Sequence, residues 1–318
     1  MPNKVLCALA PAIAALFSAT PALAAPQVVA TIKPLHSLVS GVMEGVGEPL
    51  LLIEGAASPH GFSMRPSDAA KLESAEIVFW IGEGMETFLA GPLDTLASDA
   101  TQVEMMAVEG ISILPLREGG LFEPHSHGDE DHAHGEGEAH DHDHHHEHGD
   151  AHIWLDPQNA RLMVAAIADA LIAADPDNAE AYNANGQELA ARLDQLQQEI
   201  DAQIAPARGK PFFVFHDAYH AFENRFDIEA TGSFTVNPEV SPGAGRLTEI
   251  QGVVAETGAA CLFAEPQFSP QVIETVAEGT GARIGTLDPL GAEIADGPDL
   301  YFTLIETMAT SLTDCLAD

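Results

Sequence analysis

The chain has 318 residues, with 12 Lys and Arg against 49 Asp and Glu, and a formal net charge of −37 at pH 7. Because a chain with this charge repels anionic surfaces, neither nucleic acid nor an anionic membrane is an expected partner. The same charge is compatible with the binding of cations. Roughly 290 residues follow the N-terminal segment, enough for two domains that each have a core.

The N-terminal segment, residues 1–24, predicts a cleavable signal peptide. Lys4 supplies the positive charge, residues 5–17 are apolar, and residues 21–24 end in the small residues that signal peptidase prefers. A membrane span needs about 20 apolar residues, and neither this stretch nor anything after residue 25 reaches that length. We therefore expect an exported, soluble chain without membrane insertion, a core helix at this end being the alternative.

The segment before residue 122 alternates predicted strands with predicted helices. Strands are predicted over residues 28–32, 50–54 and 77–81, and helices over residues 34–42 and 66–74. This alternation is typical of a parallel sheet covered by helices.

Residues 122–150 differ from the rest in composition, because histidines interleave with Asp, Glu and Gly and no Lys or Arg intervenes. Such a polar segment cannot offset the entropy of ordering, so we expect a loop that is disordered without a ligand. Imidazole binds Zn²⁺, Cu²⁺ and Ni²⁺, which makes the loop a candidate accessory metal site, with a solvated spacer as the alternative. Its histidines are His125, His127, His132, His134, His140, His142, His144, His145, His146 and His148.

A long helix is predicted over residues 178–204, where the sequence has no proline and only one glycine, Gly186. At about 1.5 Å per residue it would span about 40 Å, the length of a two-domain protein. A helix over residues 158–174 precedes it, and Asp175-Pro176-Asp177 separates the two.

Four more strands are predicted after this helix, over residues 212–215, 228–233, 261–264 and 284–287. The chain therefore reads as two similar α/β halves with parallel sheets. The predicted organisation is a signal peptide (1–24), an N-terminal α/β domain (25–175), a linking helix (176–206) and a C-terminal α/β domain (207–318).

Four candidate metal ligands fall at strand ends or in loops that follow strands: His60, His152, His216 and Asp288. Ligands bind outside the carboxyl ends of parallel strands, so two sheets facing each other across a cleft would bring the four together. Three neutral imidazoles and a carboxylate suit tetrahedral Zn²⁺. Because no compact motif contains these four residues, each could instead be an ordinary polar or turn residue without a metal-binding role.

The segment His216-Asp217-Ala218-Tyr219-His220 is similar to the HExxH motif of zinc proteases. That motif needs both histidines on one helical face, whereas His216 ends a predicted strand, so we expect the two to diverge. A zinc hydrolase is thus the less favoured reading, and no enzymatic activity is expected. His220 and His36 are expected to be structural or surface residues.

Cysteine usage fits an oxidising compartment. Cys7 would leave with the signal peptide, and Cys261 and Cys315 remain as an even pair. A bond between them would fasten the C-terminal helix to the last domain, whereas two buried free thiols are the alternative.

Five stretches together resemble the metal-binding branch of ABC-transporter solute-binding proteins, and most closely the periplasmic zinc-binding ZnuA group. They are HIWLDP (152–157), FHDAY (215–219), FTVNPE (234–239), FAEPQ (263–267) and TLDPLG (286–291). The resemblance implies two (βα)₄-like domains joined by one long rigid helix, with small tilts on metal binding. It also implies a monomeric, high-affinity periplasmic receptor that delivers Zn²⁺ to an ABC transporter permease.

Other partners and functions stay open beside this reading. A periplasmic zinc metallochaperone is a further candidate partner. A zinc adhesin or storage protein would use the same fold without a permease. Deleting residues 123–150 is expected to lower the zinc stoichiometry while leaving one tight site.

The resemblance also implies the ligand set. The first three ligands match His60, His152 and His216, and imidazole at the third position, where manganese-binding relatives have glutamate, favours zinc. The fourth matches Asp288, with water as the competitor, because Pro59 replaces the acidic residue that some zinc-binding members carry there.

Two further features complete the predicted site and fold. Glu265 follows a predicted strand, as the ligands do, so it is expected beside them without binding the metal. The pair Cys261 and Cys315 matches the disulfide of the group.

Overall fold

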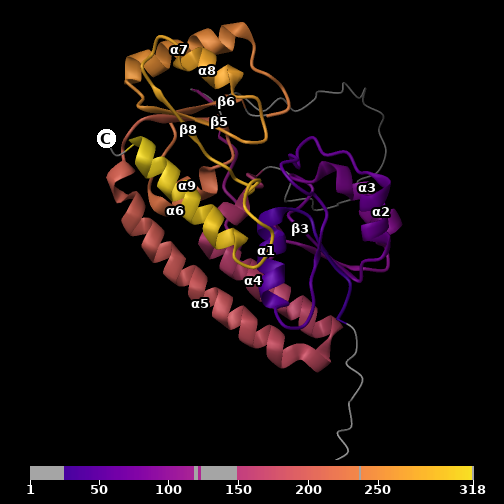
Figure 1. Cartoon of the computed structure of the whole chain (residues 1–318). Coiled ribbons are helices and arrows are strands. Elements are labelled where there is room, and N and C mark those ends of the chain that lie inside the picture. Colours follow the sequence, from indigo (N-terminus) through magenta and orange to yellow (C-terminus); the bar gives the residue numbers. More distant parts are fainter. Residues whose placement is uncertain (1–24, 118–120, 123–148, 236–237, 317–318) are drawn as a thin grey trace, which may run out of the picture.

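The computed structural model describes residues 25–117, 121–122, 149–235 and 238–316 (Figure 1). The predicted signal peptide and the ten histidines of the predicted accessory loop lie outside the described residues. Within them, no helix combines the length and the apolar character that crossing a membrane requires.

Four parallel strands form the sheet of the N-terminal half, in the order β2-β1-β3-β4. The central strands β1 (Val28–Ala30) and β3 (Ile77–Trp80) are buried and apolar, as expected for parallel strands covered on both faces. β2 (Leu50–Leu51) and β4 (Thr101–Glu104) are the edges. β4 is missing from the predicted strands because its sequence Thr-Gln-Val-Glu has a single apolar residue.

Three α-helices accompany this sheet: α1 (Lys33–Val42), α2 (Pro66–Glu73) and α3 (Ala90–Leu96). Proline stands in the first turn of α1 and of α2, where its missing N–H costs nothing. The α2 helix is also capped by Asp68, which accepts a hydrogen bond from the Arg65 backbone N–H at 2.9 Å. These features begin both helices close to where the sequence predicts them.

The C-terminal half repeats the same winding, with strands in the order β6-β5-β7-β8. The strands are β5 (Phe212–His216), β6 (Gly232–Thr235), β7 (Cys261–Ala264) and β8 (Arg283–Thr286). Because both sheets are parallel and share one strand order, the expectation of two similar α/β halves is confirmed. β6 begins at Gly232, later than the predicted strand, which started at residue 228.

The helices of the C-terminal half are α6 (His220–Phe226), α7 (Ala244–Thr257), α8 (Gln271–Ala277) and α9 (Leu300–Leu316). In Figure 1, α7 and α8 lie on one side of the second sheet and α6 and α9 on the other. The sheet is thus covered on both faces.

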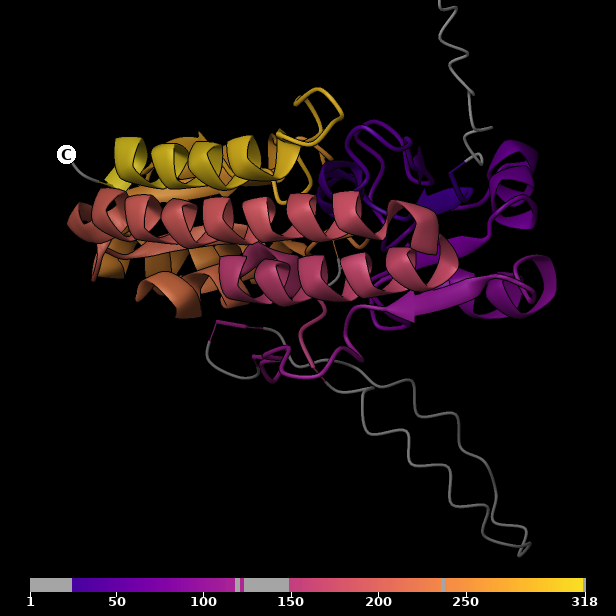
Figure 2. The same cartoon turned by 90° about the horizontal axis from the view of Figure 1, so that it is seen from below.

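One long helix, α5 (Ala179–Ile204), runs beside both halves (Figure 1). Its 26 residues span about 39 Å. Figure 2 shows α4 (Pro157–Ala174) and the yellow α9 on either side of it. The buried side of α5 follows the three-and-four spacing of an amphipathic helix: Tyr182, Gly186, Leu189, Leu193, Leu196, Ile200 and Ile204.

The two halves share one hydrophobic core. A continuous cluster of buried side chains runs from β1 and β3 through α4 and α5 into β5 and α9. α1 approaches α5 closely at Gly41, where a Cβ atom would lie 2.7 Å from Leu189. A shared core of this kind resists rotation of one half against the other, because rotation would expose apolar surface.

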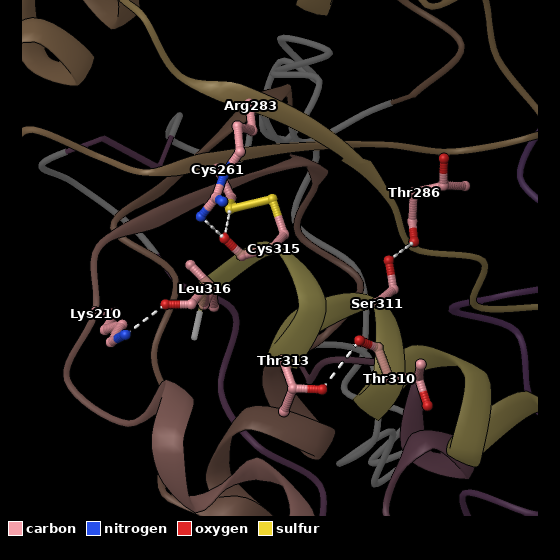
Figure 3. Close-up of a disulfide and its surroundings, with 9 residues drawn as sticks. All are labelled: Lys210, Cys261, Arg283, Thr286, Thr310, Ser311, Thr313, Cys315 and Leu316. Atoms are coloured by element: carbon pink, nitrogen blue, oxygen red, sulfur yellow. Dashed lines mark hydrogen bonds between the residues drawn. A yellow bond between two sulfur atoms is a disulfide. The ribbon is translucent and has the colours of Figure 1, made fainter. Parts of the chain in front are cut away.

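The disulfide between Cys261 and Cys315 joins β7 to the end of α9 (Figure 3). Beside it, Arg283 of β8 donates a hydrogen bond to the Cys315 carbonyl, and Lys210 donates to the Leu316 carbonyl at 2.6 Å. The pairing confirms the disulfide reading of the sequence, and the free-thiol alternative is wrong. These contacts fasten the last helix to the second sheet.

Candidate metal centre

Three histidines from distant parts of the chain meet between the two halves. His60 lies in the loop after β2, His152 precedes the short turn Ile153–Leu155, and His216 is the last residue of β5. The His152 Nε2 atom is 3.3 Å from the Nε2 atom of His60 and 3.3 Å from that of His216. One ligand atom from each of the three lies within 4.8 Å of the others.

This spacing fits one tetrahedral zinc ion. Zn–N bonds of about 2.0–2.1 Å at tetrahedral angles separate two ligand nitrogens by about 3.3 Å. Both Nε2 separations from His152 have that value. The His152 ring therefore stands where an ion shared with His60 and His216 would place it.

Buried carboxylates orient two of the three rings. The Nδ1 atom of His152 lies 2.7 Å from Asp150 Oδ1, and the Nδ1 atom of His216 lies 2.6 Å from Glu265 Oε1. Because an ionised carboxylate only accepts hydrogen bonds, each Nδ1 carries a proton, and in a neutral ring Nε2 then presents a lone pair. Two lone pairs this close repel each other, so the arrangement calls for a cation between them.

The topology of the second sheet explains why His216 and Glu265 meet. The chain passes from β5 to a neighbour on one side and from β7 to a neighbour on the other, so β5 and β7 flank the switch point of the sheet. His216 ends β5 and Glu265 directly follows β7. Ligands of open parallel sheets bind in the crevice at this point, outside the carboxyl ends of the strands.

Charge also balances at this centre. Asp150 is 4% exposed and Glu265 is 3% exposed, so both carboxylates are buried beside the rings. The pKa of Asp150 lies below its ordinary value. Burial alone would raise this pKa, but the attraction and the hydrogen bonds of His152 together outweigh the effect of burial. Two carboxylates and a divalent cation add up to zero net charge, which removes the main cost of burying an ion.

The cavity that the histidines line is small, with about 10 Å³ of free volume. That is close to the least room that a single water molecule or ion occupies. Apolar residues form much of its wall: Pro59, Trp154, Phe268, Pro289 and Leu290. A wall of this kind keeps bulk solvent away from the ion and strengthens the attraction between a cation and its ligands.

Burial lowers the pKa of His60 well below its ordinary value of 6.5, and the neighbouring His152 and His216 rings lower it further. The neutral imidazole is the form that binds a metal. Desolvation thus keeps His60 ready to act as a ligand in mildly acidic solution.

Asp288 lies in the loop after β8, close in sequence to Leu290 of the cavity wall. Its Oδ1 atom accepts hydrogen bonds from Gln267 Nε2 at 2.8 Å and from the backbone N–H groups of Leu290 and Gly291. Its Oδ2 atom accepts from the Ala292 N–H at 2.6 Å. In the described residues the group of converging ligand atoms contains the three histidines and not Asp288.

The segment that follows His152 connects the two halves. Trp154 Nε1 donates to the Pro289 carbonyl at 2.8 Å, and Tyr301 Oη donates to the Trp154 carbonyl at 2.7 Å. Asp156 caps α4 and binds the Arg225 guanidinium through both oxygens at 2.7 Å. The HIWLDP stretch therefore fixes His152 against the loop that carries Asp288.

The two histidines of the protease-like stretch diverge, as the sequence predicts. His216 ends β5 with its ring in the cluster, whereas His220 is the first residue of α6 and is not a member of the cluster. His36 is structural, because it is buried and its Nε2 lies 3.0 Å from the Pro49 carbonyl. A helical HExxH site is therefore absent from this stretch.

Asp150 is the site residue that the sequence patterns did not single out. It stands at the end of the acidic tract, where the sequence does not distinguish it from the other carboxylates. The usable signal is the spacing Asp-x-His, because an Asp often accepts from the backbone N–H two residues ahead. Asp150 Oδ1 does so here, 3.0 Å from the His152 backbone nitrogen.

Comparison with known proteins agrees with the geometry. The ZnuA family, described as zinc-uptake complex component A, periplasmic, matches residues 28–315. The high-affinity zinc uptake system protein ZnuA of Brucella suis is 51% identical over 305 residues, 91% of each chain. Its namesake in Yersinia pestis is 39% identical over 302 residues, 92% of each chain.

The fold agrees as well. The crystal structure of a ZnuA protein superposes with a TM-score of 0.75 at 23% identity, covering 92% of this chain and 99% of the other. At that identity the likeness concerns the fold alone. From the family match and the relatives, the chain belongs to the ZnuA family of periplasmic zinc-uptake components, a family of transport proteins and not of enzymes.

Proposed function

We propose that this protein captures Zn²⁺ in the periplasm through His60, His152 and His216 and delivers it to the permease of an ABC importer. The main support for this proposal is the convergence of the three rings, because His152 Nε2 lies 3.3 Å from the Nε2 atoms of His60 and His216. In addition, the Nδ1 atoms of His152 and His216 are each bound to a buried carboxylate. The names of the relatives, both zinc uptake system proteins, support import over storage or adhesion.

In place of Asp288, which the sequence favours, we propose water as the fourth ligand in the described conformation, with Asp288 as its competitor. Both Asp288 oxygens already accept hydrogen bonds, and Asp288 would have to give some of them up to reach the ion. Charge supports this choice, because Asp150 and Glu265 already compensate Zn²⁺. A water ligand also exchanges faster than a fixed side chain, which suits a protein that must release its cargo.

Further parts of the proposal concern regions outside the site. We propose the division into residues 25–175, 176–206 and 207–318, export by residues 1–24, and a monomeric protein that a zinc metallochaperone can load. The shared core and the continuous α5 support small tilts between the halves in place of a wide hinge motion.

The test is a zinc titration of the purified protein against a chelator of known affinity, with Mn²⁺ as the comparison metal. We expect one tight zinc site and much weaker binding of Mn²⁺, because imidazole nitrogens suit zinc and carboxylate oxygens suit manganese. Equal affinity for the two metals, or no tight site, would refute the proposal. Rescue of a zinc-starved deletion strain by added zinc tests the import step.

A further inference from the structure

The two ends of the histidine-rich insertion meet in an ordered neck, which we define as residues 113–117 and 149–150. Pro115 and Gly149 form an antiparallel bridge, and the Asp150 N–H donates to the Leu114 carbonyl at 2.8 Å. A Cβ atom at position 149 would overlap a methyl carbon of Ile113, so any larger residue there would displace that side chain. The neck is therefore part of the folded structure.

One segment of the neck, residues 149–150, reaches His152. Asp150, 4% exposed, holds both the backbone nitrogen and the ring of His152 through the same oxygen, Oδ1. This double contact fixes the direction of the His152 ring. Its other oxygen, Oδ2, is buried and has no hydrogen-bond partner among the described residues.

The other segment of the neck, residues 113–117, reaches Asp217, the neighbour of His216. Arg117, whose side chain is 11% exposed, binds the carboxylates of Asp217 and Glu223, which lie 100 and 106 positions further along the chain. Asp217 directly follows His216, and Glu223 stands on α6 and also accepts from the Ala230 N–H at 3.1 Å. Two buried carboxylates facing one guanidinium offset the cost of burying its charge.

From these contacts we infer that the neck is a working part of the metal centre, with Asp150 and Arg117 as positioning residues for His152 and His216. This inference rests on the proposed function. The inference assigns different roles to the neck and to the tract of residues 123–148. Deleting the tract should leave the tight zinc site intact, whereas deleting the neck should not. A deletion of residues 123–150, which looks harmless in the sequence, removes Asp150 and damages the centre.

The experiment measures zinc affinity by chelator competition, and the visible absorption of the Co²⁺-loaded protein, for D150A, D150N and R117Q in the full chain. We expect D150A to lose about 10–100-fold in zinc affinity, the usual effect of removing a carboxylate that orients a metal-bound histidine. D150N, whose amide oxygen still accepts from Nδ1, should lose less. R117Q should lose affinity and alter the Co²⁺ spectrum, because the ligand field changes when His216 shifts.

Two matched controls keep folding effects apart. Asp175 is a buried carboxylate that accepts from Tyr182 Oη at 2.9 Å and from Asn178, outside the histidine cluster. Arg208 donates to the Phe226 carbonyl at 3.0 Å and forms an ion pair with Asp201, also outside the histidine cluster. D175A and R208Q should lower the melting temperature while zinc affinity and the Co²⁺ spectrum stay as in the wild type.

Wild-type affinity in D150A and D150N, or equal losses in D175A, would overturn the inference. If D150A does not fold, D150N decides, and an unchanged affinity and spectrum count against the inference. A wild-type protein without a tight zinc site would refute the proposed function instead. The deletion of residues 123–148 should keep the tight site, and the deletion of residues 123–150 should weaken it.

Discussion

The two sides of the metal cavity are built differently. His152 and His216 are buried, 8% and 3% exposed, and each has its Nδ1 bound to a carboxylate. His60 is half-buried and stands on a loop, and the hydrogen-bond partner of its ring among the described residues is the His152 ring and not a carboxylate. One side is thus fixed before an ion arrives, and the other is held mainly by the neighbouring rings.

This difference suggests a division of roles within one site. Fixed ligands reduce the entropy that binding would cost, and they supply affinity. A ligand on a loop can leave the ion first, which allows release to a partner within the lifetime of an encounter. We expect His152 and His216 to set affinity and His60 to set the rate of zinc release.

The largest expected effect comes from removing a fixed ligand. H152A or H216A should lower zinc affinity by more than the roughly 100-fold that loss of an orienting partner costs. H60A should lose less affinity and should show its loss mainly as faster dissociation. Stopped-flow release to an excess of chelator measures both. Equal dissociation rates in H60A and H216A would contradict the comparison.

A smaller effect is expected from the carboxylate behind His216. E265A should reduce zinc affinity by about 10–100-fold, and E265Q, which keeps an acceptor for Nδ1, should reduce it less. Chelator competition measures the affinities. A loss in E265Q as large as in H216A would mean that Glu265 binds the ion directly.

The Asp288 side chain should matter for the loop more than for the ion. D288N should change zinc affinity by less than about tenfold, while the protein loses stability because backbone N–H groups lose a charged acceptor. Thermal unfolding and zinc titration of the same sample separate the two effects. An affinity loss equal to that of H216A would make Asp288 the fourth ligand.

The smallest effect concerns pH. Burial lowers the pKa of His60 from 6.5. Just below that pH, His60 is therefore protonated in the unfolded chain and still neutral in the folded metal-free protein. The free energy of unfolding of the metal-free protein should therefore fall as pH drops from about 7 to about 5.5, and less so in H60Q. NMR titration should place the His60 midpoint below the ordinary value of 6.5. A midpoint at or above that value would contradict this expectation.

Much of the fold is readable from the sequence. Buried strands such as β1, β3 and β5 have continuous apolar runs, and α5 has a strong amphipathic repeat and no proline. The edge strand β4 escapes prediction because a half-exposed edge needs few apolar residues. β6 begins later than the predicted strand, because its pairing with β5, and not local composition, determines where it begins.

The site was predictable in part. Strand-end position and resemblance select His60, His152, His216 and Glu265, and the structure brings all four side chains to one cavity. The residues that position these ligands are harder to read. Asp150 merges with the acidic tract before it, and Arg117 pairs with carboxylates 100 and 106 positions away, a separation that no local pattern encodes.

The most direct measurement is a crystal structure of the zinc-loaded protein, with anomalous scattering recorded at the zinc edge. We predict one ion between the two halves, bonded to Nε2 of His60, His152 and His216 at about 2.0–2.1 Å. Asp150 and Glu265 should still hold the Nδ1 atoms of His152 and His216. An ion bound elsewhere, or one that lacks any of the three histidines, would contradict this prediction.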